Sequence, residues 1–282
     1  MKHSHESRLL ALLLAQVGAR PRGEIVIDAD DGVLCTTGFV ESGLLRRSRR
    51  DAGDLWTPEM SSTVFDAYEA SKASSEGAWY RCRVLVTSAS EVAFSYFHQR
   101  EALKDIAGIP RDSLGSLPGF VFRARFDKEL LALIDDGDIS TAILFFVPAE
   151  LERGGAVSEA LLSLYATVDW QGDTNNGSLD QYFARAQDPY GGLDRARLYG
   201  ATLAGLELIG HDAAVVLFRE ALAAYSAFHE RVDAVREQLG IARLPSGIES
   251  DVINAYWDIE RQVETLRAAY VRANLGTLVG GG

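Results

Sequence analysis

The spacing of hydrophobic residues changes near residue 125, and this change constrains the fold more than any other feature of the chain. Before that point, Trp79–Thr87 and Glu91–His98 alternate apolar and polar residues, which is the period of half-buried antiparallel strands. After it, apolar residues recur every three or four positions almost to the end of the chain. The sequence therefore predicts two domains: an α+β N-terminal domain with antiparallel hairpins, residues 1–125, and an all-α helical bundle, residues 126–282.

The first helix of the N-terminal domain is predicted from apolar residues that share one helical face: Leu9, Leu10, Leu13, Leu14 and Val17. The same run, preceded by Lys2 and Arg8, also fits the apolar part of an export signal. Glu6 and Gln16 interrupt that pattern, so we interpret the run as a core helix. No stretch reaches the roughly 20 apolar residues of a membrane span. We therefore expect a cytoplasmic protein that does not associate with membranes.

Short β-favouring runs complete the prediction for the N-terminal domain. Glu24–Asp28 and Val33–Phe39 flank the sequence Ala29-Asp30-Asp31-Gly32, which favours a hairpin turn. The run Ser61–Ser74 has helical spacing, and Phe120–Phe126 is predicted to add a further strand. Helices that alternate with hairpins in this way are typical of an α+β domain.

Seven segments of the C-terminal domain have the spacing of helices: Lys128–Ile134, Thr141–Leu151, Ser158–Val168, Leu179–Ala186, Leu193–Ile209, His211–Leu239 and Glu249–Leu275. Gly210, Gly240 and Gly247 follow or separate them, and Asp188–Gly192 has the composition of a turn. The segments share no repeat period. A packed bundle is therefore expected rather than a solenoid.

The charge of the chain is distributed as unevenly as its hydrophobic pattern. Acidic residues exceed basic ones by 40 to 28, which gives a net charge of −12. The stretch up to Arg125 contains 16 of each, whereas the rest contains 24 acidic and 12 basic residues. Such a domain repels the phosphates of nucleic acids and attracts basic partners. We therefore expect no direct binding to nucleic acid. The one basic cluster, Arg46–Arg50, precedes Asp51 and Asp54 and is interpreted as a solvated loop.

A motif in the C-terminal domain resembles a known family. The stretch Asn175-Asn176-Gly177-Ser178-Leu179-Asp180-Gln181-Tyr182-Phe183 precedes a helix that ends in Leu206-x-x-Ile209-Gly210. This pattern resembles a bacterial DNA-mimic protein family, which pairs an Asn-Gly-Gly-x-x-Gln-aromatic-aromatic stretch with a later helix ending in Ile-Gly. The resemblance covers roughly Asp127–Val279. Ser178 replaces the usual second glycine, and Arg185 stands where the family often has asparagine.

Five residues of this motif are predicted to be structural: Asn176, Gly177, Gln181, Tyr182 and Phe183. Asn176-Gly177 fits a turn, and Ser178 can cap the following helix. Gln181 is expected to bond the backbone of the loop, while Tyr182 and Phe183 enter the core. The motif therefore points to architecture rather than to a binding site.

The resemblance implies that function lies in surface charge, because a DNA mimic presents carboxylates at spacings that imitate backbone phosphates. Residues four apart on a helix rise about 6 Å, close to the gap between neighbouring phosphates along a strand. The candidate partner-binding residues lie on the last two predicted helices: Glu230, Asp233, Glu237, Asp251, Asp258, Glu260 and Glu264. Each of them also fits an ordinary solvated helix face.

The sequence contains no pattern that points to catalysis or to a bound metal. It lacks paired histidines or cysteines at zinc spacing, a nucleophile elbow, a Walker loop and a dinucleotide fingerprint. The acidic cluster Asp135-Asp136-x-Asp138 is explained by a loop and a helix cap. Cys35 and Cys82 fall in predicted strands, where we expect buried, unreactive thiols. We expect neither an enzyme nor a cofactor; an enzyme of unknown type is kept as a third, remote hypothesis.

The N-terminal domain supports a second hypothesis. The order of Trp79–Val84 and then Phe94–Phe97 resembles small bacterial immunity proteins, which carry a tryptophan-led strand and an aromatic strand after a helix. The first hypothesis is a non-catalytic protein that binds a basic DNA-binding protein by imitating DNA. The alternative is an immunity protein that neutralises a cognate toxin, and a nuclease toxin would suit both. The sequence leaves the oligomeric state open, with a homodimer as one option.

Overall fold

The protein divides into two compact units, Met1–Val121 and Phe122–Gly282, which we call the sheet unit and the helical unit. The computed structural model describes residues 2–17, 22–30, 33–42, 48–88, 91–111, 115–176, 179–184, 194–239 and 250–279. The predicted fold class is confirmed: the first unit combines an antiparallel sheet with helices, and the described residues of the second are helical. The division falls within α5 (Gly119–Ala124), next to the change in hydrophobic spacing.

The sheet unit is built on one antiparallel sheet in which the strands follow the order β3-β2-β1-β4-β5. Its strands are β1 (Arg22–Asp30), β2 (Val33–Ser42), β3 (Ser48–Asp51), β4 (Trp79–Ser88) and β5 (Glu91–His98). Both predicted hairpins are present, with Ile25 opposite Gly38 and Val84 opposite Phe94. The β1–β2 turn was predicted at Ala29–Gly32, of which Asp31 and Gly32 lie outside the described residues.

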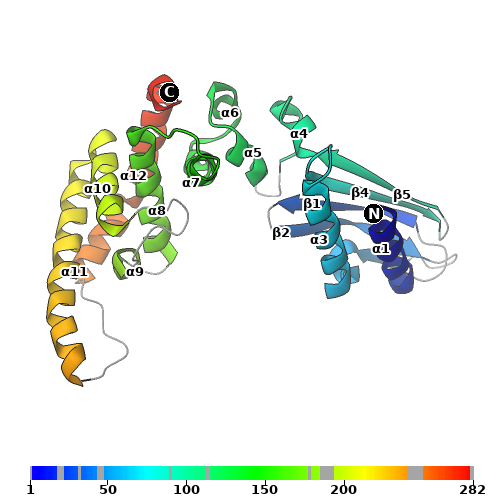
Figure 1. The fold of residues 1–282 in the computed structure, drawn as a ribbon, viewed down its shortest axis with the longest axis horizontal. Coiled ribbons are helices and arrows are strands. Elements are labelled where there is room, and N and C mark those ends of the chain that lie inside the picture. Colours follow the sequence, from blue (N-terminus) through cyan, green and yellow to red (C-terminus); the bar gives the residue numbers. More distant parts are fainter. Residues whose placement is uncertain are drawn as a thin grey trace. The chain divides into compact units, whose positions relative to one another are not determined.

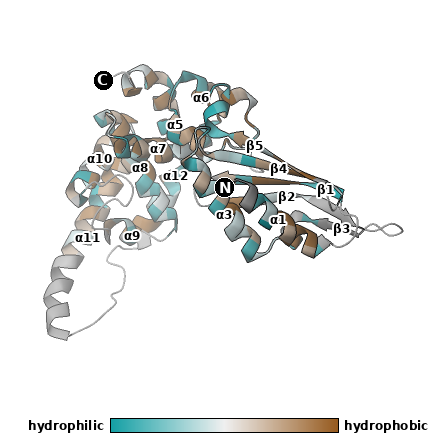
Figure 2. Ribbon diagram, turned by 45° about the vertical axis from the view of Figure 1, so that its right-hand side comes forward, coloured by the Kyte–Doolittle hydropathy of each residue, from teal (hydrophilic) through white to brown (hydrophobic). Residues whose placement is uncertain are grey.

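Helices α1 (Lys2–Val17) and α3 (Pro58–Lys72) cover one face of this sheet, as Figure 1 shows. The strands turn alternate residues to that face, and the alternation of hydrophobic and hydrophilic residues along β4 can be followed in Figure 2. The resulting core joins the apolar sides of both helices to β1 and β4; it includes Leu9, Leu13, Ile25, Ile27, Met60, Val64, Tyr68, Cys82 and Val84. The predicted face of the first helix is thus confirmed at its centre.

The opposite face of the sheet carries charged pairs that are held across strands. Arg81 donates two hydrogen bonds to Asp28, at 2.6 and 3.0 Å, and Arg83 donates two to Glu24, at 2.5 and 3.0 Å. This fork geometry matches the guanidinium to the carboxylate. The hydrogen bond from Arg83 lowers the pKa of Glu24. Arg81 and Arg83 are therefore neutralised within the sheet itself.

Three expectations for the N-terminal domain were wrong. Phe120–Phe126 is not a strand, because Gly119–Ala124 forms α5 and buries Phe120, Val121 and Phe122 together; three consecutive apolar residues fit a buried helix as well as a strand. Part of the basic cluster forms the edge strand β3, where charged residues are common. Cys35 is exposed, because its register with Asp28 places it on the open face of the sheet.

The helical unit contains the helices predicted from the sequence, with bounds that differ by up to eight residues, at the end of α8. They are α6 (Lys128–Leu133), α7 (Asp136–Glu152), α8 (Glu159–Asn176), α9 (Leu179–Ala184), α10 (Arg195–Leu208), α11 (Asp212–Leu239) and α12 (Ser250–Val279). The predicted turn at Asp188–Gly192 lies outside the described residues. Short elements complete the chain: α2 (Ala52–Leu55), α4 (Gln99–Ala102) and a 3₁₀ turn at Ile106–Gly108.

Helix α8 is the centre of the helical unit. Every residue from Leu161 to Gln171 is buried, so the helix packs on all sides. The approach of α10 is close, because a Cβ at Gly205 would lie 2.3 Å from the carbonyl oxygen of Ser163. Trp170 of α8 contacts the rings of Phe218 and Tyr256, which belong to α11 and α12. The packing on α8 determines which faces of α10, α11 and α12 point outward.

Candidate protein-binding surface of the helical unit

The acidic residues predicted on α12 lie on two different faces of that helix. Asp251 and Asp258 are separated by two helical turns and share one face, whereas Glu260 lies on the other side. Asp258 is exposed and neighbours the exposed Trp257, whereas Glu260 and Glu264 are half-buried. The side chain of Asp251 is outside the described structure. The prediction from sequence treated these carboxylates as one set of candidates. Of those whose side chains are described, Asp258 is exposed, whereas Glu260 and Glu264 are half-buried.

Glu260 takes part in internal contacts between α12 and α8. Its carboxylate accepts a 2.8 Å hydrogen bond from the amide of Asn175, and its backbone carbonyl accepts one of 3.0 Å from Gln171. The oxygen of the same Asn175 amide accepts a 2.5 Å hydrogen bond from the hydroxyl of Tyr256. Burial raises the pKa of that hydroxyl, so Tyr256 remains a donor. Glu260 therefore fixes the C-terminal end of α8, and its own side chain is less free to contact a partner protein.

A buried arginine lies behind this contact. Arg267 of α12 donates hydrogen bonds to Thr167 (2.9 Å) and Gln171 of α8, and to Ser140 of α7 (3.0 Å). Burial lowers its pKa to about 10, against the opposing attraction of Glu264. These hydrogen bonds connect α12 to α7 and α8, three helices that all contact one another.

The predicted residues of α11 lie on its C-terminal half, which extends beyond the other helices of the unit in Figure 1. The structure places the backbone at Glu230, Asp233 and Glu237 in the helix but does not describe their side chains. Their role as partner-binding residues stays a prediction.

A shallow groove of about 480 Å³ lies between α8 and α10. Six residues line it: Glu159, Ala160, Ser163, Ala204, Glu207 and Leu208. The floor is made of small side chains because the two helices approach closely at Gly205. Carboxylates stand on both helices, since Glu159 belongs to α8 and Glu207 to α10. A groove of this kind can hold the aliphatic stem of a lysine or arginine beside a carboxylate.

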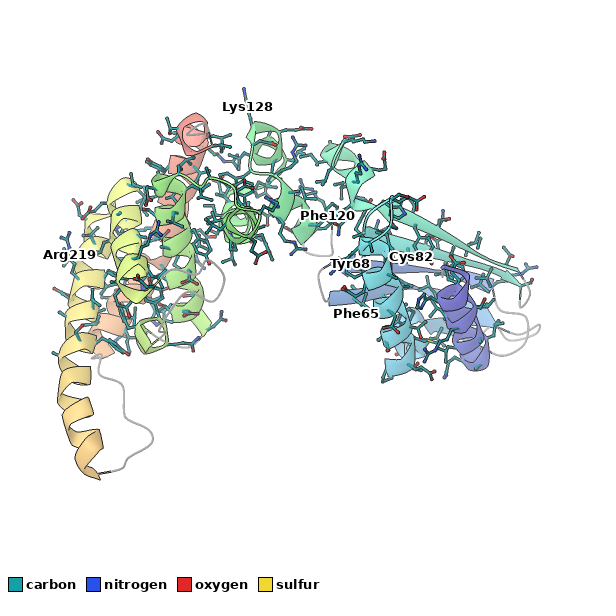
Figure 3. The ribbon with its side chains drawn as sticks, in the orientation of Figure 1. Phe65, Tyr68, Cys82, Phe120, Lys128 and Arg219 are labelled. Atoms are coloured by element: carbon teal, nitrogen blue, oxygen red, sulfur yellow. The ribbon has the colours of Figure 1, made fainter. Side chains whose placement is uncertain are left out.

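The first two turns of α11 continue this acidic surface. Asp212, Val216 and Glu220 are exposed and four residues apart, so they follow one side of the helix over a rise of about 12 Å. Arg219, labelled in Figure 3, bridges to Glu207 at 2.8 Å and joins α11 to α10 beside the groove. We call the set Glu159, Glu207, Leu208, Asp212, Val216 and Glu220 the acidic surface.

The acidic surface is only partly neutralised by its own neighbours. Glu159 is 85% exposed and lies 3.5 Å from Arg197, a long ion pair. Among the residues that the structure describes, no lysine or arginine lies within ion-pair distance of Asp212 or Glu220. Leu208 and Val216 add exposed apolar area, and Val216 is 52% exposed. Exposed carboxylates with apolar neighbours suit a basic protein partner.

The residues of the acidic surface were not singled out from the sequence. Glu207 and Glu159 are 48 positions apart, and only the packing of α10 on α8 brings them to one groove. The one available signal was the spacing Asp212-x-x-x-Val216-x-x-x-Glu220, which repeats every four residues. Prediction from sequence favoured the C-terminal part of the same helix instead.

Of the described motif residues, the two aromatic ones lie inside the unit, as predicted, whereas Asn176 and Gln181 are exposed. Tyr182 and Phe183 are fully buried, and the hydroxyl of Tyr182 lies 2.7 Å from that of Thr202 on α10. The amide of Asn176 donates to the carbonyl oxygen of Gly172 at 2.8 Å, within the last turn of α8. Gly177 and Ser178, the predicted turn and cap, lie outside the described residues.

The described part of the chain has no cluster of three or more histidine, cysteine, aspartate or glutamate side chains arranged for a metal ion. The cluster at Asp135-Asp136-x-Asp138 begins α7, and Asp136 accepts a 2.7 Å hydrogen bond from Arg272. None of the helices described combines the length and apolar character needed to cross a bilayer.

The fold and the surface define an acidic helical unit with an open, carboxylate-lined groove. Residues 155–274, which run from just before α8 into α12, match the family model described as DMP19-like protein. That family is a DNA-mimic family, so the match supports the coarser part of the resemblance seen in the sequence. No curated protein and no solved structure is significantly similar to the chain.

Proposed function

We propose that this protein binds a basic, DNA-binding protein through its helical unit and inhibits or regulates it by occupying its DNA-binding surface, without catalysing a reaction. The match of residues 155–274 to the DMP19-like family carries this proposal. The acidic surface supports it, because its carboxylates are exposed, with Glu159 85% and Glu207 56% exposed. The predicted carboxylates of α11 and Asp258 extend the proposed contact.

The charge of the unit supports an electrostatic mechanism of association. Complementary charge speeds encounter, and rising salt screens it over a Debye length of about 8 Å at physiological ionic strength. Duplex DNA competes for the same basic surface on the partner. Binding is therefore expected to weaken with salt and to be displaced by duplex DNA.

The test uses the immobilised full chain to capture proteins from a lysate of the source cells. Bound proteins are eluted in steps of rising salt or by added duplex DNA and are identified. The partner is then purified, and its affinity for the full chain is measured. The proposal expects a DNA-binding protein that DNA displaces. Binding that is indifferent to both salt and DNA would overturn it.

Two matched variants locate the contact. The first changes Glu159, Glu207 and Glu220 to glutamine, and the second changes Glu59, Glu69 and Glu101 of the sheet unit in the same way. All six residues are exposed, and both variants alter the net charge equally. Exposed charge contacts contribute about 0.2–1 kcal/mol each, so the first variant is expected to bind about tenfold more weakly. The second variant should bind like the parent protein.

The same capture separates the alternative function. A secreted toxin that binds one-to-one, keeps its affinity in the first variant and is not displaced by DNA would point to the immunity hypothesis. That result would move the binding site to the sheet unit and leave the acidic surface without its proposed role.

A further inference from the structure

The sheet unit contains a cavity that the proposed function does not use. It has a volume of about 310 Å³ and lies between α1, α3 and the strands β4 and β5. Its lining residues are His5, Ala67, Ala70, Ser71, Ala73, Ser74, Trp79 and Tyr96. Pockets that bind small molecules typically measure about 300–1,000 Å³, so this cavity suits a small ligand.

The walls of the cavity are apolar and partly aromatic. Helix α3 presents the small side chains of Ala67, Ala70 and Ala73, which leave space above the sheet. The floor is formed by the rings of Trp79 and Tyr96, whose centroids are 5.7 Å apart at an angle of 55°. Tyr68 is labelled on α3 in Figure 3. Its ring meets that of Trp79 edge-on, with 5.6 Å between the centroids, and so supports the position of Trp79. An apolar body, and above all a flat ring, fits between these walls.

A smaller space, lined mainly by apolar side chains such as Leu9, Ile27 and Val64, adjoins the cavity and contains one carboxyl group. It measures about 10 Å³, enough for one water-sized group, and shares His5, Ala67, Trp79 and Tyr96 with the larger cavity. This small space is also lined by Glu6 and by Cys82, which is labelled in Figure 3.

The hydroxyl of Tyr96 is held at this smaller space between two side chains. It is hydrogen-bonded to the carboxylate of Glu6 and to the thiol of Cys82. Burial raises the pKa of Cys82 to about 12, so the thiol is uncharged at neutral pH. The carboxyl group of Glu6 lines the smaller space, together with the imidazole of His5.

We propose that this cavity binds a small amine with an apolar, aromatic body. The body would occupy the larger space against Trp79 and Tyr96, and the ammonium group would occupy the smaller space beside Glu6. No lysine or arginine is among the described lining residues, so a carboxylate or phosphate ligand would find no such cation there. An ammonium group is of water size and pairs with both the carboxylate and the faces of the rings. The proposal does not depend on the function of the helical unit.

The test compares three probes that share an indole ring and differ in one group: tryptamine, tryptophol and indole-3-acetate. Their affinities for the full chain are measured by isothermal titration calorimetry. Tryptamine is expected to bind at least about tenfold more tightly than tryptophol, because a hydrogen bond to a charged group is stronger than a neutral one. Indole-3-acetate is expected to bind weakest of the three. Alanine methyl resonances locate the site, and those of Ala67, Ala70 and Ala73 should shift with tryptamine.

Two variants and a control make the test specific. Glu6→Gln keeps an oxygen for the Tyr96 hydroxyl but removes the charge, so it should abolish most of the advantage of tryptamine over tryptophol. Ala70→Phe fills the cavity from an exposed position of α3 and should weaken all three probes. Glu69→Gln changes an exposed carboxylate of α3 outside the lining and should leave every affinity unchanged.

Several outcomes would overturn the proposal. Equal affinities for the three probes would show that Glu6 does not select an amine. Methyl shifts away from α3, or tryptamine binding that survives Ala70→Phe, would place the ligand elsewhere. Absence of tryptamine binding at millimolar concentration in the folded parent protein would reject the ligand class.

Discussion

The two units differ in charge and in where some of their arginines lie: the stretch up to Arg125 contains 16 acidic and 16 basic residues, whereas the rest contains 24 acidic and 12 basic residues. In the sheet unit, Arg81 and Arg83 lie on the open face of the sheet and pair with carboxylates of the next strand. In the helical unit, Arg267 is buried and binds hydroxyl and amide groups. Other arginines of the helical unit, such as Arg219 and Arg272, pair with exposed carboxylates, so the acidic character of the unit follows from its small number of basic residues. The comparison therefore separates the role of an arginine in packing from its role in surface charge.

The largest expected effect is the loss of this buried arginine. Arg267→Ala removes the donors that Thr167, Ser140 and Gln171 share and leaves a cavity between α7, α8 and α12. Such losses lower the free energy of unfolding by about 3 kcal/mol or more. Urea denaturation followed by far-UV circular dichroism measures it. The matched control is Arg83→Ala on the open face of the sheet, which should leave the unfolding midpoint nearly unchanged. Similar unfolding midpoints for the two variants would contradict the expected difference between a buried and an exposed arginine.

Two glycines allow each unit to be destabilised separately. Gly38 of β2 has a φ of +104°, and a Cβ there would lie 2.2 Å from the carbonyl oxygen of Glu24. At Gly205 of α10 the corresponding distance to Ser163 is 2.3 Å. Each glycine-to-alanine change forces a backbone shift that typically costs about 1–3 kcal/mol.

The measurement is hydrogen exchange of the intact chain, analysed by peptide. Gly38→Ala should speed exchange in β1, β2 and β4, and Gly205→Ala should speed it in α8 and α10. If the units fold independently, neither change affects exchange in the other unit. Faster exchange throughout the chain in either variant would show that the units unfold together.

The parts of the fold that could be predicted from the sequence are those where local pattern and tertiary packing agree. The strands β4 and β5 and the long helices α11 and α12 were found because each presents one apolar face. Phe120–Phe126 was assigned wrongly because its three consecutive apolar residues, Phe120–Phe122, fit a strand and a buried helix alike. The acidic surface was missed for a different reason. Glu159 and Glu207 meet only through the close contact at Gly205, and no local pattern reports such a contact.

The smallest predicted effect concerns how each unit keeps one carboxylate ionised. The pKa of Glu24 is lowered from 4.5 chiefly by the hydrogen bond from Arg83. For Asp127, burial raises the pKa, but hydrogen bonds from the backbone N–H of Leu130 and from Arg125 outweigh it and lower the pKa below 3.8. A carboxyl group with a lowered pKa contributes stability above its ordinary pKa, and that contribution is lost as the pH falls through the lowered value. Both contributions should therefore disappear in acid, below pH 4.5 for Glu24 and below pH 3.8 for Asp127.

The two carboxylates should respond differently when their arginine is removed, and carboxyl ¹³C resonances followed from pH 2 to pH 7 measure the response. Arg83→Gln should return the pKa of Glu24 close to 4.5, because the lowering depends on that side chain. Arg125→Gln should raise the pKa of Asp127 only in part, because the N–H of Leu130 still donates to its carboxylate at 3.0 Å. The helix terminus is thus the more robust anion site, since its donor belongs to the backbone. A return of the Asp127 pKa to 3.8 in Arg125→Gln would show that the arginine, and not the backbone at the start of α6, keeps this carboxylate ionised. The two units would then keep their carboxylates ionised by the same means.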